Sequence, residues 1–211
     1  MTDLFKHHRI VTDGVALHYV SIGAGKPVIL LHGFPQTWFE WRPLIALLGE
    51  GYRIVAPDLR GIGASPGPVG GDDKVTMASD VHAIAEAEFG DTPAVVVGHD
   101  LGGYVAFAYA LRFRAAVKAL IIADAPLPGT SLFEAIKGNP RVWHIAFHGA
   151  RDFAEMLIAG RERAYVRQFI HARIVDTGAV PEDDIDVYDH AYAAPGAMRA
   201  ALEIVPHIRP G

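Results

Sequence analysis

One short segment, residues 95–103, constrains the fold of this chain more than any other. Three consecutive valines lead into Gly98, His99 and Asp100, and Leu101 follows with two more glycines. An apolar strand that enters a tight turn between glycines and leaves it as a helix is typical of a nucleophile elbow. Small residues are needed there because the strand and helix backbones crowd each other. The side chain that such an elbow exposes at the top of the sheet is here Asp100.

A carboxylate at this place points to a particular chemistry. Asp100 acting as a nucleophile forms an ester by opening an alkyl carbon, which indicates epoxides or alkyl halides as substrates rather than esters and amides. The alternative is that Asp100 is an ordinary residue of a glycine-rich turn between a strand and a helix. Further features of the chain favour the nucleophile.

The N-terminal part of the chain alternates strands with helices. Asp13 and Gly14 predict a hairpin turn between two strands, over residues 9–12 and 16–21. Apolar runs predict buried strands over residues 28–31, 53–56, 94–97 and 117–123, and helices are predicted over 41–48, 77–88 and 102–113. This alternation predicts an α/β fold with a mostly parallel sheet.

The pattern changes at the proline-rich segment 125–129. No strand is evident from there to Pro210, and helices are predicted over residues 153–159, 161–171 and 195–204. A helical insertion after an α/β core has the plan of a lid. We therefore expect a core over residues 1–128 and a helical lid, itself incomplete, over residues 129–211.

Composition restricts the partners. The net charge is −5 with no basic cluster, so neither nucleic acid nor an anionic membrane is expected as a partner. No apolar run reaches the ~18 residues of a membrane span, and the N-terminus lacks the apolar stretch of a secretory signal. The absence of cysteine fits a cytoplasmic protein. We expect neither a cofactor nor a metal, and a homo-oligomer is compatible with the sequence.

Over residues 9–205 the chain resembles the α/β-hydrolase superfamily, in the branch of epoxide hydrolases and haloacid or haloalkane dehalogenases. The segment 32–38, His-Gly-Phe-Pro-Gln-Thr-Trp, is similar to the oxyanion loop of that family. The resemblance implies that the backbone N–H groups of Phe34 and Leu101 form the oxyanion hole. His32 is expected to be a structural hydrogen-bonding residue rather than a base.

The resemblance also gives a role to Asp124, which ends the predicted strand after the elbow. In some branches of the family the orienting acid stands at this strand end. A carboxylate there can reach the ring of a histidine that faces the nucleophile. The alternative is an aspartate that caps the turn over residues 125–128.

A third feature is the segment 143–148, Trp-His-Ile-Ala-Phe-His. It is similar to a subgroup of epoxide hydrolases that holds the epoxide oxygen with a lid histidine and a tyrosine, and His144 would be that histidine. The alternative is a lid histidine bonded to the backbone. His148, His171 and His190 have no such support and are expected on the surface.

The residues around the elbow also bear on the substrate. Haloacetate dehalogenases of this branch carry arginine after the nucleophile, and haloalkane dehalogenases carry tryptophan there and usually asparagine in the oxyanion loop. Leu101 and Phe34 occupy these places here, which argues against both kinds of dehalogenase. We expect a small, neutral, apolar substrate in a pocket lined by Phe34, Trp38, Leu101 and Trp143.

The family's sheet continues after the lid with two more strands and a catalytic histidine, and no residue here matches that histidine. His207 is not expected to replace it, because it lies on a different element. After Glu203 the family pattern continues with an apolar residue and then Tyr-Arg, where the tyrosine is the second lid group on the epoxide oxygen. Removing one base from a back-translation of residues 204–211 gives Met-Tyr-Arg-Thr-Phe-Asp-Gln, which fits that pattern. We therefore expect a one-base frameshift and a truncated chain.

These features together predict that the parent protein opens an epoxide to a diol through an ester on Asp100. The truncated chain itself is expected to be inactive. A haloacid or haloalkane dehalogenase of the same branch and a non-catalytic α/β-hydrolase fragment are the alternatives.

Overall fold

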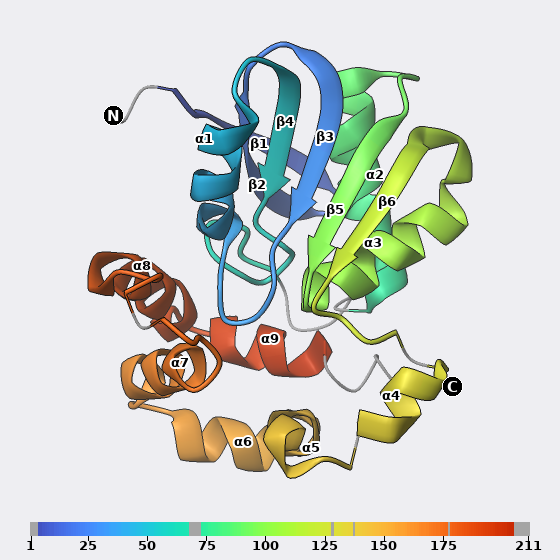
Figure 1. Ribbon diagram of the computed structural model, residues 1–211. Helices are drawn as coiled ribbons and strands as arrows, with labels where there is room; N and C mark the ends of the chain where they lie inside the picture. The colour runs from blue at the N-terminus through green and yellow to red at the C-terminus, as the bar shows by residue number, and fades with distance from the viewer. Residues whose placement is uncertain (1–3, 68–72, 128, 137, 177, 205–211) are drawn as a thin grey trace.

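The computed structural model describes residues 4–67, 73–127, 129–136, 138–176 and 178–204. Within these ranges six strands form one sheet with the order β1-β2-β4-β3-β5-β6 (Figure 1). The strands are β1 (Lys6–Thr12), β2 (Val15–Ile22), β3 (Gly25–Leu31), β4 (Gly51–Pro57), β5 (Ala94–His99) and β6 (Val117–Ala123).

One side of the sheet is antiparallel and the rest is parallel. β1 and β2 form a hairpin whose turn residues, Asp13 and Gly14, have φ angles of 47° and 76°, as a tight hairpin turn requires. β2 also runs antiparallel to β4, whereas β4, β3, β5 and β6 are parallel to their neighbours. The prediction of a mostly parallel α/β sheet is confirmed.

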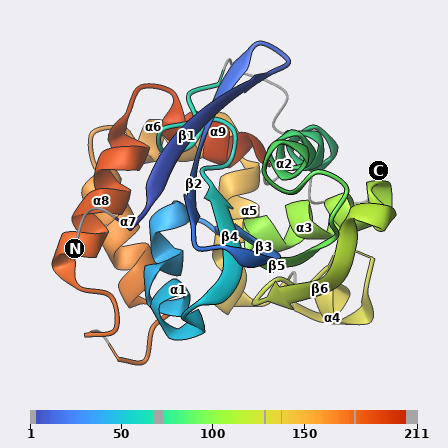
Figure 2. The same ribbon diagram turned by 90° about the horizontal axis from the view of Figure 1, so that it is seen from above.

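Helices cover both faces of the parallel strands, which explains their continuous apolar runs. A 3-10 turn, η1 (Trp38–Trp41), leads into α1 (Arg42–Leu48) on one face, and α2 (Lys74–Phe89) and α3 (Leu101–Arg112) lie on the other (Figure 2). A second 3-10 turn, η2 (Arg114–Ala116), joins α3 to β6.

The turn from β5 to α3 has the geometry of a nucleophile elbow. Asp100 stands between the two elements with φ 47° and ψ −116°, a conformation that a non-glycine residue rarely adopts. The strand and the helix approach so closely that a Cβ atom on Gly98 would lie 2.3 Å from the carbonyl oxygen of Gly102. The glycines are therefore required by the packing of β5 against α3.

Among the described residues after 123 no strand occurs, and the chain is helical. The helices are α4 (Ser131–Ile136), α5 (Trp143–Gly149), α6 (Arg151–Ile158), α7 (Glu162–His171), α8 (Glu182–Ala193) and α9 (Ala197–Ile204), with a 3-10 turn, η3 (Pro140–Val142), before α5. Three of them, α6, α7 and α9, were predicted. The other three were not predicted, since α4 and α5 are short and α8 is dominated by acidic residues.

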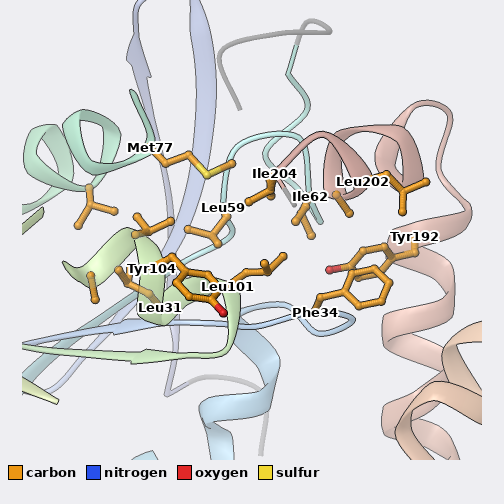
Figure 3. Packing of buried hydrophobic residues seen from close by; sticks show 14 of the residues in the cluster. Leu31, Phe34, Leu59, Ile62, Met77, Leu101, Tyr104, Tyr192, Leu202 and Ile204 are labelled. Carbon is orange, nitrogen blue, oxygen red and sulfur yellow. The ribbon is translucent and has the colours of Figure 1, made fainter. Parts of the chain in front are cut away.

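These helices lie across the carboxyl ends of the parallel strands (Figure 1). They share one hydrophobic core with the sheet rather than forming a separate one. Phe34 from the loop after β3 and Leu101 and Tyr104 from α3 belong to one cluster with Tyr192 of α8 and Ile204 of α9, and Phe34 lies next to Tyr192 (Figure 3). The helical layer is therefore held over the elbow by buried apolar contacts.

Two further points concern the edges of the described chain. β6 pairs only with β5 among the described residues, and it carries Ile121, which is 51% exposed. Residues 205–211, with His207 and the segment assigned to a frameshift, lie outside the described residues. None of the described helices has the length and apolar character to span a membrane.

Candidate active site

A cavity of about 460 Å³ lies between the elbow and the helical layer. Its walls combine many apolar side chains with a few polar ones. The polar and charged residues are Gln36, His99, Asp100, Tyr104, Asp124, Arg141, His144, His148 and Arg173, and the apolar ones include Phe34, Leu101, Ile145, Phe169 and Ile174. A concave, mostly apolar pocket with a few convergent polar groups is typical of a small-molecule site.

Asp100 enters this cavity from the apex of the elbow. Its Oδ2 accepts a hydrogen bond from the backbone N–H of Phe34 at 3.0 Å, and the N–H of Leu101 also bonds to the carboxyl. Its own N–H donates to the carbonyl of Ala123 at 3.0 Å, which ties the elbow to β6. The two N–H groups expected to form an oxyanion hole thus converge on the carboxyl of Asp100.

Burial raises the pKa of Asp100 above its ordinary value, against the opposing effects of the Phe34 N–H and the neighbouring His99. The His99 ring is partly buried, which by itself lowers its pKa. The hydrogen bond from its Nδ1 to Oε2 of Glu40 at 3.2 Å, with the charges of Glu40, Asp100 and Asp124, outweighs burial and raises the pKa. These carboxylates favour the cationic form of the imidazole that lies next to the candidate nucleophile.

Asp124 lies at the end of β6, directly after Ala123, and lines the same cavity. β5 and β6 pair with His99 opposite Ala123, so Asp100 and Asp124 follow adjacent strand ends. Asp124 is exposed and has a φ of 50°. No histidine among the described residues hydrogen-bonds to it, so its orienting role stays a prediction.

His144 and His148 face the cavity from successive turns of α5. Burial lowers the pKa of His144 to about 4 and that of His148 to about 3, with the charge of Arg173 acting in the same direction on both. The expectation that His148 lies on the surface is wrong: it is 2% exposed, and its Nε2 is hydrogen-bonded to the hydroxyl of Tyr165. His171 is partly exposed and His190 is exposed.

His32 is a structural residue, as expected. It is fully buried, its Nε2 accepts the N–H of Leu59 at 3.0 Å, and its Nδ1 lies 3.0 Å from the carbonyl of Gly33. Because Nε2 accepts, the proton is on Nδ1 and is donated to Gly33. Both ring nitrogens are used by backbone groups, and neither is available as a base.

Comparison with known proteins adds to this geometry. Residues 26–147 match the family model described as the alpha/beta hydrolase fold. The chain belongs to the α/β-hydrolase family. This α/β hydrolase is 38% identical over 213 residues to a soluble epoxide hydrolase of Corynebacterium sp. (strain C12), an alignment that covers 96% of this chain and 72% of that protein. An AB hydrolase superfamily protein of Bacillus subtilis (strain 168) is 32% identical over 95% of this chain and 72% of its own length.

Solved structures show the same relationship. The epoxide hydrolase CorEH without ligand superimposes with a TM-score of 0.87 at 36% identity, over 97% of this chain and 74% of that one. Cfl2 of Burkholderia cenocepacia superimposes with a TM-score of 0.92 at 35% identity, over 99% of this chain and 73% of that one. The resemblance to the α/β-hydrolase superfamily is therefore confirmed in both sequence and fold.

Two of the predicted pocket residues of this α/β hydrolase do not line the cavity. The ring of Trp38 packs against Phe5 at 5.1 Å and His7 at 5.7 Å between ring centres, with the cluster on the α1 face of the sheet. Trp143 begins α5 and is 49% exposed. On that helix His144 and His148 are four residues apart and share the inward face, so Trp143 is turned away from it.

Several cavity residues were missed by sequence reasoning. Tyr104 stands one helical turn after Leu101 on α3, and that spacing could have identified it. Arg141 and Arg173 had no comparable signal, because they come from distant parts of the helical layer. Arg173 donates a hydrogen bond to Nδ1 of His144 at 2.7 Å. It is therefore connected to the site by His144, which was predicted as a site residue.

Proposed function

We propose that this α/β hydrolase opens an epoxide with Asp100 as the nucleophile, beneath a helical lid formed by residues 129–204. One observation carries the proposal: a carboxyl at the apex of a strained elbow, inside the cavity, bonded by the N–H groups of Phe34 and Leu101. The relationship to the soluble epoxide hydrolase of Corynebacterium supports the substrate class. We also propose a division between core and lid at residue 128 and a cytoplasmic location.

The first step is nucleophilic ring opening. An oxygen of ionised Asp100 forms a bond to one epoxide carbon, and the bond from that carbon to the ring oxygen breaks. His144 is the lid group proposed to donate a hydrogen bond to the ring oxygen as its negative charge develops, and the oxygen takes its proton from water. All atoms of the epoxide remain on the enzyme, so the product is a hydroxyalkyl ester of Asp100.

The second step is hydrolysis of this ester. Water attacks the carbonyl carbon of Asp100, and the N–H groups of Phe34 and Leu101 stabilise the oxyanion that forms on its carbonyl oxygen. The bond from that carbon to the ester oxygen then breaks, the diol leaves with a proton from the water, and the carboxyl of Asp100 is restored. A general base that takes a proton from the water raises the rate by about 10²–10⁴-fold. In the family this base is a histidine, and Asp124 is proposed to orient its ring. No described histidine bonds to Asp124, so the experiment below measures the first step, the alkylation of Asp100.

The substrate proposed is a small neutral epoxide, because Leu101 beside the nucleophile and Phe34 opposite it are apolar and buried. A haloacid is the second candidate. It is favoured by Arg141, a cation of the cavity wall whose side chain makes no ion pair with the described residues. Asp100 could displace a halide from such a substrate by the same attack.

Intact-protein mass spectrometry tests the proposal on the chain as it exists. Incubation with styrene oxide should add the mass of one epoxide, and peptide mapping should place it on Asp100. Asp100→Asn should abolish the adduct. Asp91→Asn, at an exposed aspartate before β5, is the matched control and should leave it unchanged. An adduct that persists in Asp100→Asn, or lies on another residue, would sink the assignment.

Fluoroacetate separates the two candidates. The neutral epoxide should modify Asp100 far faster than fluoroacetate releases fluoride, since Leu101 beside the nucleophile offers no charge to a substrate carboxylate held there. The reverse order would assign the chain to the haloacid dehalogenases and give Arg141 the role of binding the carboxylate.

A further inference from the structure

The contact between Arg173 and His144 determines where the proton of the imidazole lies. An Nη atom of Arg173 lies 2.7 Å from Nδ1 of His144. A guanidinium can only donate hydrogen bonds, so Nδ1 must be the unprotonated acceptor. The proton of the neutral ring is therefore on Nε2. Since Nδ1 is turned to Arg173 and the ring lines the cavity, the Nε2–H group is the one left for a ligand.

Arg173 is itself held in place by Phe169, one turn earlier in the chain. Its guanidinium carbon lies 3.5 Å from the centre of the Phe169 ring, and its other Nη donates to the Phe169 carbonyl at 2.9 Å. Phe169 is buried at 6% exposure and packs edge-on against Phe34, so it is anchored to the oxyanion loop. An arginine stacked and hydrogen-bonded in this way has little freedom to leave His144.

The surroundings of His144 also keep it neutral. Burial is the larger cause and the positive charge of Arg173 the second, and together they lower its pKa to about 4, against the opposing charge of Asp124. His148, on the same helix face, is neutral as well, because burial and the nearby His144 and Arg173 lower its pKa to about 3. At neutral pH the ring is thus a neutral donor rather than an imidazolium that could pair with Asp100.

We propose that Arg173 is a positioning residue for epoxide opening, which fixes the tautomer and orientation of His144 so that Nε2–H donates to the epoxide oxygen. This inference rests on the proposed function of the site. It concerns a residue that touches neither the nucleophile nor the oxyanion loop directly in the described contacts. Arg173 acts only through His144, and that separates it from a residue that merely stabilises the lid.

A double-mutant cycle tests this dependence. The rate of Asp100 alkylation by styrene oxide is measured by mass spectrometry in the full chain and in Arg173→Met, His144→Gln and the double variant. Arg173→Met should slow alkylation by about 10-fold or more, the size of the loss when a group that orients a metal-binding histidine is removed. In the His144→Gln background the same substitution should change the rate by less than about 2-fold. An equal loss in both backgrounds would overturn the proposal.

Two further variants guard against a general structural effect. Arg173→Lys keeps a donor and a charge and should recover part of the rate. Arg161→Met is the matched control, because Arg161 is also exposed and also donates to a backbone carbonyl, that of Leu157, but lies outside the cavity. It should react like the unmodified chain. A loss in Arg161→Met equal to that in Arg173→Met would show that the lid is simply destabilised.

Nitrogen-15 NMR of His144 gives a readout that does not need the reaction. In the unmodified chain the ring should be the Nε2–H tautomer and stay neutral at about pH 6, whereas in Arg173→Met its pKa should rise toward the ordinary value of about 6.5. An unchanged tautomer and pKa in Arg173→Met would refute the inference. Absence of any alkylation, with the NMR result as expected, would instead refute the proposed function.

Discussion

The substitution Gly102→Ala sets two physical effects against each other at the elbow. Gly102 is the second residue of α3, where replacing glycine by alanine ordinarily stabilises a helix by up to ~1 kcal/mol. A Cβ atom there would lie 2.2 Å from the carbonyl oxygen of Leu31 and 2.6 Å from that of His32. Both distances are far below van der Waals contact, so the helix would have to move away from β3.

The size of the loss follows from what the new methyl group meets. Overpacking a core costs about 1–3 kcal/mol and occasionally more, and the upper end applies where the neighbours cannot rotate away. Here both neighbours are backbone carbonyls at the end of a central strand. A cost of ~3 kcal/mol less ~1 kcal/mol of helix propensity leaves a net destabilisation of ~2 kcal/mol. For a chain of this size that lowers Tm by ~4–8 °C.

The assay is equilibrium unfolding in urea, with alkylation of Asp100 measured in parallel. Gly138→Ala is the matched control, because a Cβ atom there meets nothing within 4 Å. It should change the free energy of unfolding by less than ~0.5 kcal/mol. Gly102→Ala should also slow alkylation, since moving α3 carries the N–H of Leu101 away from the carboxyl. A Gly102→Ala variant as stable as the unmodified chain would refute the argument from crowding at the elbow.

Four other predictions concern charge and the sheet edge. Alkylation by styrene oxide should rise with pH as Asp100 ionises, with a midpoint above ~3.9 because burial raises its pKa; a midpoint at or below that value would contradict this cause. The same raised pKa means that ionised Asp100 destabilises the folded state above its unfolded pKa, so Asp100→Asn should raise Tm at pH ~7 and have little effect at pH ~3, where both states are protonated. Asp80→Asn should destabilise the chain by roughly 3 kcal/mol in urea unfolding, because it breaks a buried bidentate ion pair with Arg60; a loss below ~1 kcal/mol would count against it. Ile121→Lys on the exposed edge strand β6 should reduce self-association in light scattering, whereas unchanged association would exclude that edge as the contact.

The local features of the sequence were sufficient for the strands, the elbow and the position of Asp100. Each depends on a few neighbouring residues: an apolar run for a strand, or small residues where two backbones cross. The helix α8 shows the limit of such reasoning. Its buried residues Ile185, Tyr188 and Tyr192 have helical spacing, but the acidic residues between them hide the pattern.

The cavity walls depended on packing that no local pattern contains. Trp143 directly precedes the cavity residue His144, and Trp38 lies two residues after Gln36, yet Trp143 is half exposed and the Trp38 ring packs against Phe5. His148 was expected on the surface and is buried.

The sequence by itself determined the α/β sheet, the elbow and the carboxylate that it presents, because these follow from short-range sterics and hydrophobic periodicity. Only the tertiary structure decided which side chains surround that carboxylate in the cavity and the state of the lid histidine. Arg173 and His144 are 29 residues apart in the chain; His144 lies on α5 and Arg173 in the turn after α7. Their contact exists only because the buried ring of Phe169 packs against Phe34 of the oxyanion loop, and that packing is a property of the whole fold.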